Sequence, residues 1–243
     1  MEDIRLTTFE DIQKEMQQHA NRNDAETLQG FYKTGPGQYG EGDIFRGIRV
    51  PQIRNLVAHF RNIPFDVAIE TLRSPWHEDR MLSLLLFVKW YKSGDSSLKA
   101  SIYRTYLDNT KHINNWDLVD FSAGHIVGAH LVNRSRKPLH KLVKSPLLWD
   151  RRIALIATIH FIRNNDFDET LKLTEKLLYD KEDLIHKAMG WMLREIGKRD
   201  PLIEEAFLKR YLNILPRTTL RYAIERFPEN KRVSYLKGTI KRT

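Results

Sequence analysis

Apolar positions along the chain recur every three to four residues, which is the period of an amphipathic helix rather than of a strand. This pattern predicts helices over residues 5–19, 25–32, 50–60, 65–72, 98–107, 139–143, 168–178 and 203–212. β-branched residues cluster only inside helical periodicity, so no strand is predicted. The pattern therefore indicates an all-α fold.

Longer helical segments alternate with these shorter ones and share one layout: a polar start, a basic residue, a long apolar run and a polar stop. They begin at Ser74, Ser145 and Asp183, and the segment from Asn114 has the same length and placement. A period near 35 residues, filled by two helices, is typical of an α-solenoid of HEAT or TPR type. We expect one domain of residues 1–243, an α-α superhelix of HEAT-like repeats with a concave groove; a globular helical bundle is the alternative.

The segment 114–130 (NNWDLVDFSAGHIVGAH) is the most informative of these helices. Residues four apart share a helix face, so the Trp116 indole should lie one turn from the Asp120 carboxylate. Asp117 is expected on the same exposed side. The opposite, buried side is expected to consist of Leu118, Val119, Phe121, Ile126 and Val127.

The repeat period also aligns residues of successive helices. Asp117, Arg152 and Lys187 are spaced by 35 positions, and Asp120 and Trp191 fall about one turn later. Arg194 shares the face of Trp191, because three residues separate them. We therefore expect one groove lined by two indoles, one or two carboxylates and several cations: Trp116, Asp120, Arg152, Lys187, Trp191 and Arg194.

Each of these side-chain types has a use at a nucleic-acid site. Cations meet phosphates, and indoles offer flat faces to a base or sugar and attract positive charge. A carboxylate can stabilise an oxocarbenium ion or orient a water molecule against an anomeric carbon. A cationic nucleobase on a glycosidic bond in a nucleic acid is a ligand that would suit the cations, the indoles and the carboxylate together. Such a base is already an activated leaving group and needs no protonation by a general acid.

Structural roles remain open for the same residues. Asp120 and Arg152 could form an ion pair between repeats, and Trp191 could belong to the core. Arg151 competes with Arg152, and only the repeat spacing favours the latter. Trp76, Trp90 and Trp149 are expected to pack between helices.

The composition limits the classes of partner and of catalytic group. The 243-residue chain carries a net charge of +9, which favours an anionic partner: nucleic acid, an anionic membrane surface or an acidic protein. It contains no cysteine, which excludes disulfides, thiol catalysis and cysteine-bound zinc and is compatible with the cytoplasm. The longest apolar runs, residues 81–88 and 153–159, are too short to span a membrane.

Other motifs add little. His125 and His130 stand five residues apart, a poor spacing for a shared metal, so we expect no metal site. Within residues 33–43, Gly35, Gly37 and Gly40 spell G-x-G-x-x-G, but Pro36 interrupts the motif and no strand precedes it, so a surface loop is predicted. Basic side chains gather at residues 134–144 and 217–242, where they contact DNA backbone or form a solvated face.

The motifs WDLVD (residues 116–120), WDRRIAL (149–155) and HKAMGWMLREIGK (186–198), together with residues 31–54, resemble the AlkD family of DNA alkylation repair enzymes. The resemblance implies HEAT-like repeats curved around duplex DNA and a monofunctional glycosylase that removes N3-methyladenine and N7-methylguanine without a cofactor. It also implies a catalytic Asp120, supported by Trp116, Trp191 and Arg152.

We expect further DNA contacts from four residues, and a monomeric, cytoplasmic protein whose partner is duplex DNA containing alkylated purines. The four are Lys187, Arg194, Asp117 and Lys33. Two functions of other classes compete with the enzyme. One is a non-catalytic binder of branched or distorted DNA, and the other is a protein-binding α-solenoid scaffold.

Overall fold

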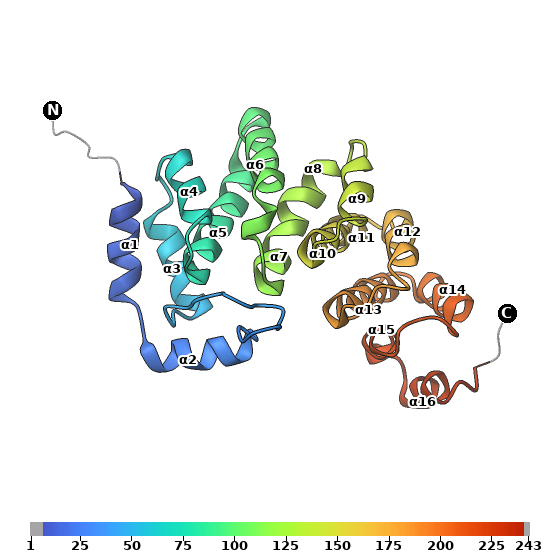
Figure 1. Cartoon of the computed structure of the whole chain (residues 1–243). Helices are drawn as coiled ribbons and strands as arrows, with labels where there is room; N and C mark the ends of the chain where they lie inside the picture. Colours follow the sequence, from blue (N-terminus) through green and yellow to red (C-terminus); the bar gives the residue numbers. More distant parts are fainter. Residues whose placement is uncertain (1–6, 241–243) are drawn as a thin grey trace. The chain divides into compact units, whose positions relative to one another are not determined.

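The computed structural model describes residues 7–240, and every regular element in this range is a helix (Figure 1). Within these residues, β-type pairing is confined to an isolated bridge between Ile44 and Trp76. The all-α prediction is therefore confirmed. The predicted start of the first helix at Arg5 lies outside the described residues. The chain divides into two compact units, the first ending at Ser122 and the second beginning at Ala123.

In its described part, from residue 7 onward, the first unit contains seven α-helices, most of them close to the predicted ranges. They are α1 (Phe9–Gln18), α2 (Arg22–Phe31), α3 (Val50–His59), α4 (Phe65–Leu72), α5 (His77–Ser93), α6 (Ser96–Asp108) and α7 (Trp116–Ala123), with a 3₁₀ turn, η1 (Thr110–His112), before α7. The last residue of α7 already belongs to the second unit.

The second unit continues with a π-helical turn, η2 (Gly124–Gly128), so the predicted helix over 114–130 begins only at Trp116 and is irregular. The remaining helices are α8 (Ala129–Leu131), α9 (Lys137–Leu142), α10 (Leu148–Ala157), α11 (Ile159–Arg163), α12 (Asp168–Lys176), α13 (Asp183–Gly197), α14 (Pro201–Tyr211), α15 (Arg217–Ala223), η3 (Ile224–Arg226) and α16 (Glu229–Lys237).

Charged side chains are buried in the first turn of α5, where the sequence pattern indicates only a polar start. The four consecutive residues His77, Glu78, Asp79 and Arg80 are each at most 4 % exposed. Glu78 accepts hydrogen bonds from three successive backbone N–H groups, residues 46–48. This turn therefore fixes the segment that leads into α3.

A seven-residue motif, S-P-x-x-x-D-R, occurs at residues 74–80 and again at 145–151 and makes the same contacts both times. Arg80 Nη1 donates to the carbonyl oxygens of Ser74 and Pro75. Arg151 Nη1 donates to the carbonyl oxygens of Ser145 and Pro146. In both copies the serine hydroxyl also donates to the motif's aspartate. The two copies lie 71 residues apart, close to two periods, which confirms the helical repeat.

The second unit is built around α13, which packs against α10, α14 and α15. Gly190 of α13 makes the contact with α15 possible. A Cβ atom at this position would lie 2.4 Å from Tyr222 Cβ and 2.5 Å from the carbonyl oxygen of Thr219. Any side chain at position 190 would therefore push the two helices apart.

This close approach gives a stability prediction. Gly190→Ala should lower the free energy of unfolding by about 1–3 kcal/mol, because the new methyl group overpacks the α13–α15 contact. The matched control is Gly30→Ala in α2, where a Cβ would meet nothing within 4 Å. That variant should gain up to about 1 kcal/mol from helix propensity. Urea unfolding measures both, and equal effects would contradict the packing explanation.

Candidate functional site

The WDLVD motif forms the start of α7, and its two acidic residues differ in burial. Asp117 is only 2 % exposed, and its Oδ1 accepts a hydrogen bond from the N–H of Leu118 at 2.8 Å. The expectation that Asp117 lies on the exposed side of this helix is therefore wrong. Asp120 lies one turn further on and is half-buried.

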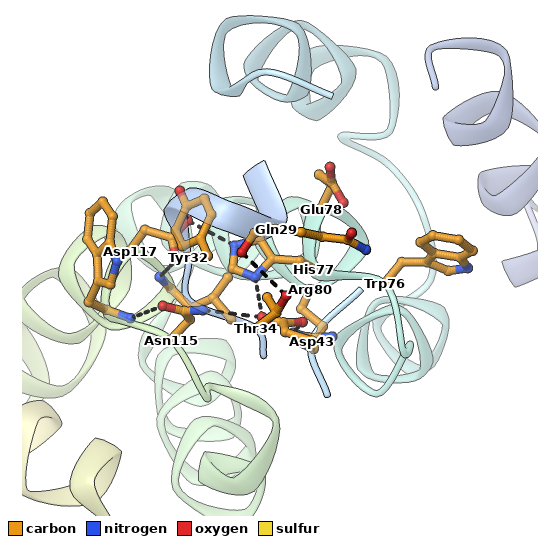
Figure 2. A network of polar contacts seen from close by, with 12 residues as sticks. Gln29, Tyr32, Thr34, Asp43, Trp76, His77, Glu78, Arg80, Asn115 and Asp117 are labelled. Atoms are coloured by element: carbon orange, nitrogen blue, oxygen red, sulfur yellow. Dashed lines mark hydrogen bonds and ion pairs between the residues drawn. The ribbon is translucent and has the colours of Figure 1, made fainter. Parts of the chain in front are cut away.

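Asp117 belongs to a buried polar network that joins α7 to α5 and to the loop after α2 (Figure 2). His77 lies between two carboxylates, with Nδ1 2.8 Å from Asp43 Oδ2 and Nε2 2.9 Å from Asp117 Oδ2. Arg80 forms an ion pair with the other oxygen of Asp43. The Nδ2 group of Asn115 donates to Asp43 Oδ2 at 3.3 Å.

The two carboxylates decide the charge of this histidine. Burial alone would lower the pKa of His77, but the charges of Asp117 and Asp43 and their hydrogen bonds outweigh it and raise the pKa to about 9. His77 is therefore an imidazolium at neutral pH and donates from both nitrogens. Burial would likewise raise the pKa of Asp43, yet His77 and Arg80 hold it below its ordinary value.

Tyr32 connects this network to the indole of the WDLVD motif. Its hydroxyl donates to Asp117 Oδ2 at 2.8 Å. Its ring stacks on Trp116, with ring centroids 5.3 Å apart and planes 20° apart, and on Phe45 at 5.0 Å and 19°. The ring of Phe31 meets Trp116 edge-on at 5.9 Å and is 61 % exposed. Trp116 itself is half-buried, so part of its indole is open to a ligand.

The apolar side of α7 and η2 follows the prediction at four of five positions. Leu118, Val119, Ile126 and Val127 are fully buried. Phe121 is only half-buried, and the Arg54 guanidinium carbon lies 5.6 Å from its ring centroid. At Phe121, this face of the helix therefore contacts the Arg54 guanidinium and is not fully buried in the apolar core.

The candidate residues of the second unit lie on α10 and α13. Arg152 is 4 % exposed, and its Nη1 donates to the carbonyl oxygen of Leu184. Trp191 is half-buried rather than sealed in the core, and its Nε1 donates to Glu195 at 3.2 Å. Arg151 is committed elsewhere, since its guanidinium binds both Asp180 and the motif carbonyls.

Two of the predicted cations on α13 face carboxylates. Lys187 Nζ lies 2.9 Å from Asp183 Oδ2, one turn earlier on the helix, and Arg194 pairs with Glu225. In the first unit, Lys33 is exposed and follows Tyr32 directly in a left-handed backbone conformation, with φ of 56°. The convergence of the α7, α10 and α13 side chains in one groove remains a prediction.

Four contributors to the site were not predicted from the sequence: Tyr32, Asp43 and His77, which form the network, and Phe31, which extends the aromatic surface. The available signal was the run of four charged residues at the start of an otherwise apolar helix. Within residues 7–240 there is no cluster of three or more histidine or acidic side chains suited to a metal ion. No helix within the same residues combines the length and hydrophobicity needed to cross a membrane.

Comparisons with known proteins agree on one family. A family model described as DNA alkylation repair enzyme matches residues 12–227. A solved structure described as a predicted DNA alkylation repair enzyme from Enterococcus faecalis superimposes with a TM-score of 0.65 at 18% identity, covering 87% of this chain and 98% of that one. At this identity the structural match supports the fold. No curated protein matches the chain.

The charged state of His77 predicts how stability depends on pH. The folded pKa of about 9 exceeds the ordinary value of 6.5. The imidazolium's contribution is therefore fully present below pH 6.5 and is lost as pH rises through 9. This loss should amount to roughly 3 kcal/mol of unfolding free energy, and urea titrations between pH 6 and 10 would measure it. His77→Gln should abolish this part of the pH dependence.

Two further variants isolate the effect. His59→Gln, which removes an exposed histidine of the same unit, is the matched control. Burial raises the pKa of Glu204 to about 8, which also costs stability as pH rises from 4.5 through 8. The comparison is therefore best made in a Glu204→Gln background. A profile that keeps its slope in His77→Gln would show that His77 is not the titrating group.

Proposed function

Because the chain belongs to the DNA alkylation repair enzyme family, we propose that it is a monofunctional DNA glycosylase that hydrolyses the N-glycosidic bond of cationic alkylated purines in duplex DNA. N3-methyladenine and N7-methylguanine are the proposed substrates, and DNA alkylation repair is its role. The observation that carries the proposal is that Asp120 lies one helical turn after Trp116 and that both residues are half-buried. The family match runs through both compact units, which favours one functional domain.

The proposed reaction uses the charge that alkylation places on the base. The bond from the deoxyribose C1′ to the base N9 breaks, and its electron pair neutralises the purine ring, so the base leaves without a proton from the enzyme. Positive charge then develops on the sugar. The oxygen of a water molecule bonds to C1′, and a proton of this water passes to a proton-accepting group or to solvent. The products are a free methylated purine and an abasic site.

Asp120 is proposed as the catalytic carboxylate. An ionised carboxylate placed against the sugar stabilises the oxocarbenium-like transition state, and its second oxygen can orient the attacking water. Asp117 does not suit this role, because it is buried and already accepts from Tyr32, His77 and Leu118. Of the two acids in the WDLVD motif, Asp120 is thus the proposed catalytic group and Asp117 is structural.

Aromatic and basic side chains are proposed to hold the substrate. Trp116 and Trp191 would contact the sugar and the lesion with their indole faces. Arg152 would anchor a nearby phosphate from the α10–α13 junction, and Lys33, Lys187 and Arg194 would set the register on the backbone. Lys187 and Arg194 would exchange their present carboxylate partners for phosphates.

The catalytic role of Asp120 is tested by removing its charge. Asp120→Asn should lower the single-turnover release of 7-methylguanine from methylated duplex by roughly 100-fold or more, because the developing sugar cation loses its counter-charge. Duplex affinity should stay within about twofold, as expected for a group that acts in the transition state. Asp66→Asn, an exposed acid on α4, is the control and should behave as wild type. Wild-type excision by Asp120→Asn would overturn this mechanism.

The DNA-contacting role of Lys33 is tested by the salt dependence of binding. Lys33→Gln should weaken binding to methylated and unmethylated duplex alike and reduce the slope of log K against log salt by about 1, as expected for one lost phosphate contact. Lys92→Gln is the matched control, because Lys92 is exposed near the opposite end of α5 from His77. Equal slopes for the two variants would exclude Lys33 from the interface.

A further inference from the structure

The Trp116 side chain is supported by other parts of the first unit rather than by its own helix. It is the first residue of α7, so no earlier turn of this helix supplies neighbours for its side chain. Its indole instead rests on the Tyr32 ring in a stacked arrangement and meets Phe31 edge-on. The orientation of the indole therefore depends on where these two rings are placed.

Tyr32 is itself a fixed support, although it stands at the end of α2 where a loop begins. It is 7 % exposed, and its ring contacts both Phe45 and His77 at centroid distances of 5.0 Å. Its backbone is also enclosed, since a Cβ atom on Gly40 would lie 2.4 Å from the Tyr32 carbonyl oxygen. By contrast, the Phe31 ring is mostly exposed and offers a weaker constraint.

The Tyr32 hydroxyl links this support back to α7. It donates to Asp117, the residue that follows Trp116, and Asp117 in turn accepts from His77. Burial and the Asp117 charge both raise the pKa of Tyr32 well above its ordinary value, so the hydroxyl remains a donor. One side chain thus stacks on the indole through its ring and bonds the adjacent residue through its hydroxyl.

We propose that Tyr32 is a positioning residue for base excision, which holds the Trp116 indole at the angle at which it meets the deoxyribose and the alkylated base. This inference rests on the proposed glycosylase function and assigns a second layer to that site. Tyr32 does not touch the substrate and acts through Trp116. The flat ring supplies the support, and its enclosure against Phe45 and His77 keeps it in place, with the hydroxyl bond to Asp117 as a secondary contact.

The placement of the indole can be measured without any activity. In protein labelled with 5-fluorotryptophan, each of the five indoles gives its own ¹⁹F resonance, and the line that disappears in Trp116→Phe belongs to Trp116. Tyr32→Met fills the space with a flexible side chain and removes the ring. In this variant the Trp116 line should shift and broaden. In Tyr32→Phe, which keeps the ring, it should stay close to its wild-type position.

The kinetic arm measures excision of 7-methylguanine under single-turnover conditions. Tyr32→Met should lose roughly 10- to 100-fold in rate, because a displaced group near the reacting centre is costly even when it still binds. Its duplex affinity should change by less than about twofold, and Tyr32→Phe should stay within about threefold of the wild-type rate. A merely structural tyrosine would instead change stability without this separation of rate from binding.

Tyr106→Phe is the matched control. Tyr106 is fully buried in the same unit, and its hydroxyl lies 2.9 Å from the Ser122 hydroxyl of α7. Its loss removes one buried hydrogen bond to α7 but none of the ring contacts of Trp116, so neither the Trp116 line nor the excision rate should change. Similar behaviour of Tyr106→Phe and Tyr32→Met would reduce Tyr32 to a general contributor to the fold.

The outcomes separate this proposal from the function on which it rests. Absence of base release by the wild-type protein would overturn the glycosylase function, whatever the spectra show. An unmoved Trp116 line or an unchanged rate in Tyr32→Met would overturn the positioning role alone. If Tyr32→Met does not fold, Tyr32→Phe decides: an unmoved Trp116 line and a rate within threefold of wild type would support positioning by the ring, whereas a displaced line or a rate loss beyond tenfold would overturn it.

Discussion

A buried imidazolium between two carboxylates is the interaction on which the first unit depends. Removing charges from water is costly unless they are paired, and here Asp43 and Asp117 balance His77 and Arg80 within one enclosed network. Each pair joins segments far apart in the chain: the loop after α2, the start of α5 and the start of α7. Loss of any one partner would leave a buried charge without compensation. The position at which α7 begins is therefore set by electrostatics as well as by apolar packing.

This network lies behind the proposed site. The Tyr32 hydroxyl donates to Asp117 of this network, and the Tyr32 ring stacks on Trp116. Asp120 follows Trp116 by one helical turn. A binding surface is precise when the residues behind it have few alternative positions. The enclosed charges, the stacked Tyr32 ring and the first turn of α7 form such a backing for the Trp116 indole, which supports the proposed placement of Trp116 at the site.

The sequence predicted what is periodic and local, and it failed where distant segments meet. Helical spacing correctly predicts most of the segment 114–130, whose helix begins at Trp116, its fully buried Leu118 and Val119, and the repeat seen in two S-P-x-x-x-D-R turns. It could not predict that Asp117 is buried, because an acidic residue in a first helical turn ordinarily faces solvent and caps the helix. Its partners, Tyr32 and His77, lie 85 and 40 residues earlier in the chain, and no single helical period connects them.

The repeat also assigns a structural role to one of two adjacent arginines in the second unit. The S-P-x-x-x-D-R turns make Arg151 equivalent to Arg80, and both bind the carbonyl groups of their own turn, so Arg151 is explained by the fold. The next position holds Met81 in one copy and Arg152 in the other, both at most 4 % exposed. A methionine fills that interior position without cost, whereas a guanidinium must be desolvated and paired. The fold does not require an arginine there, and this supports the proposed role of Arg152 at a phosphate.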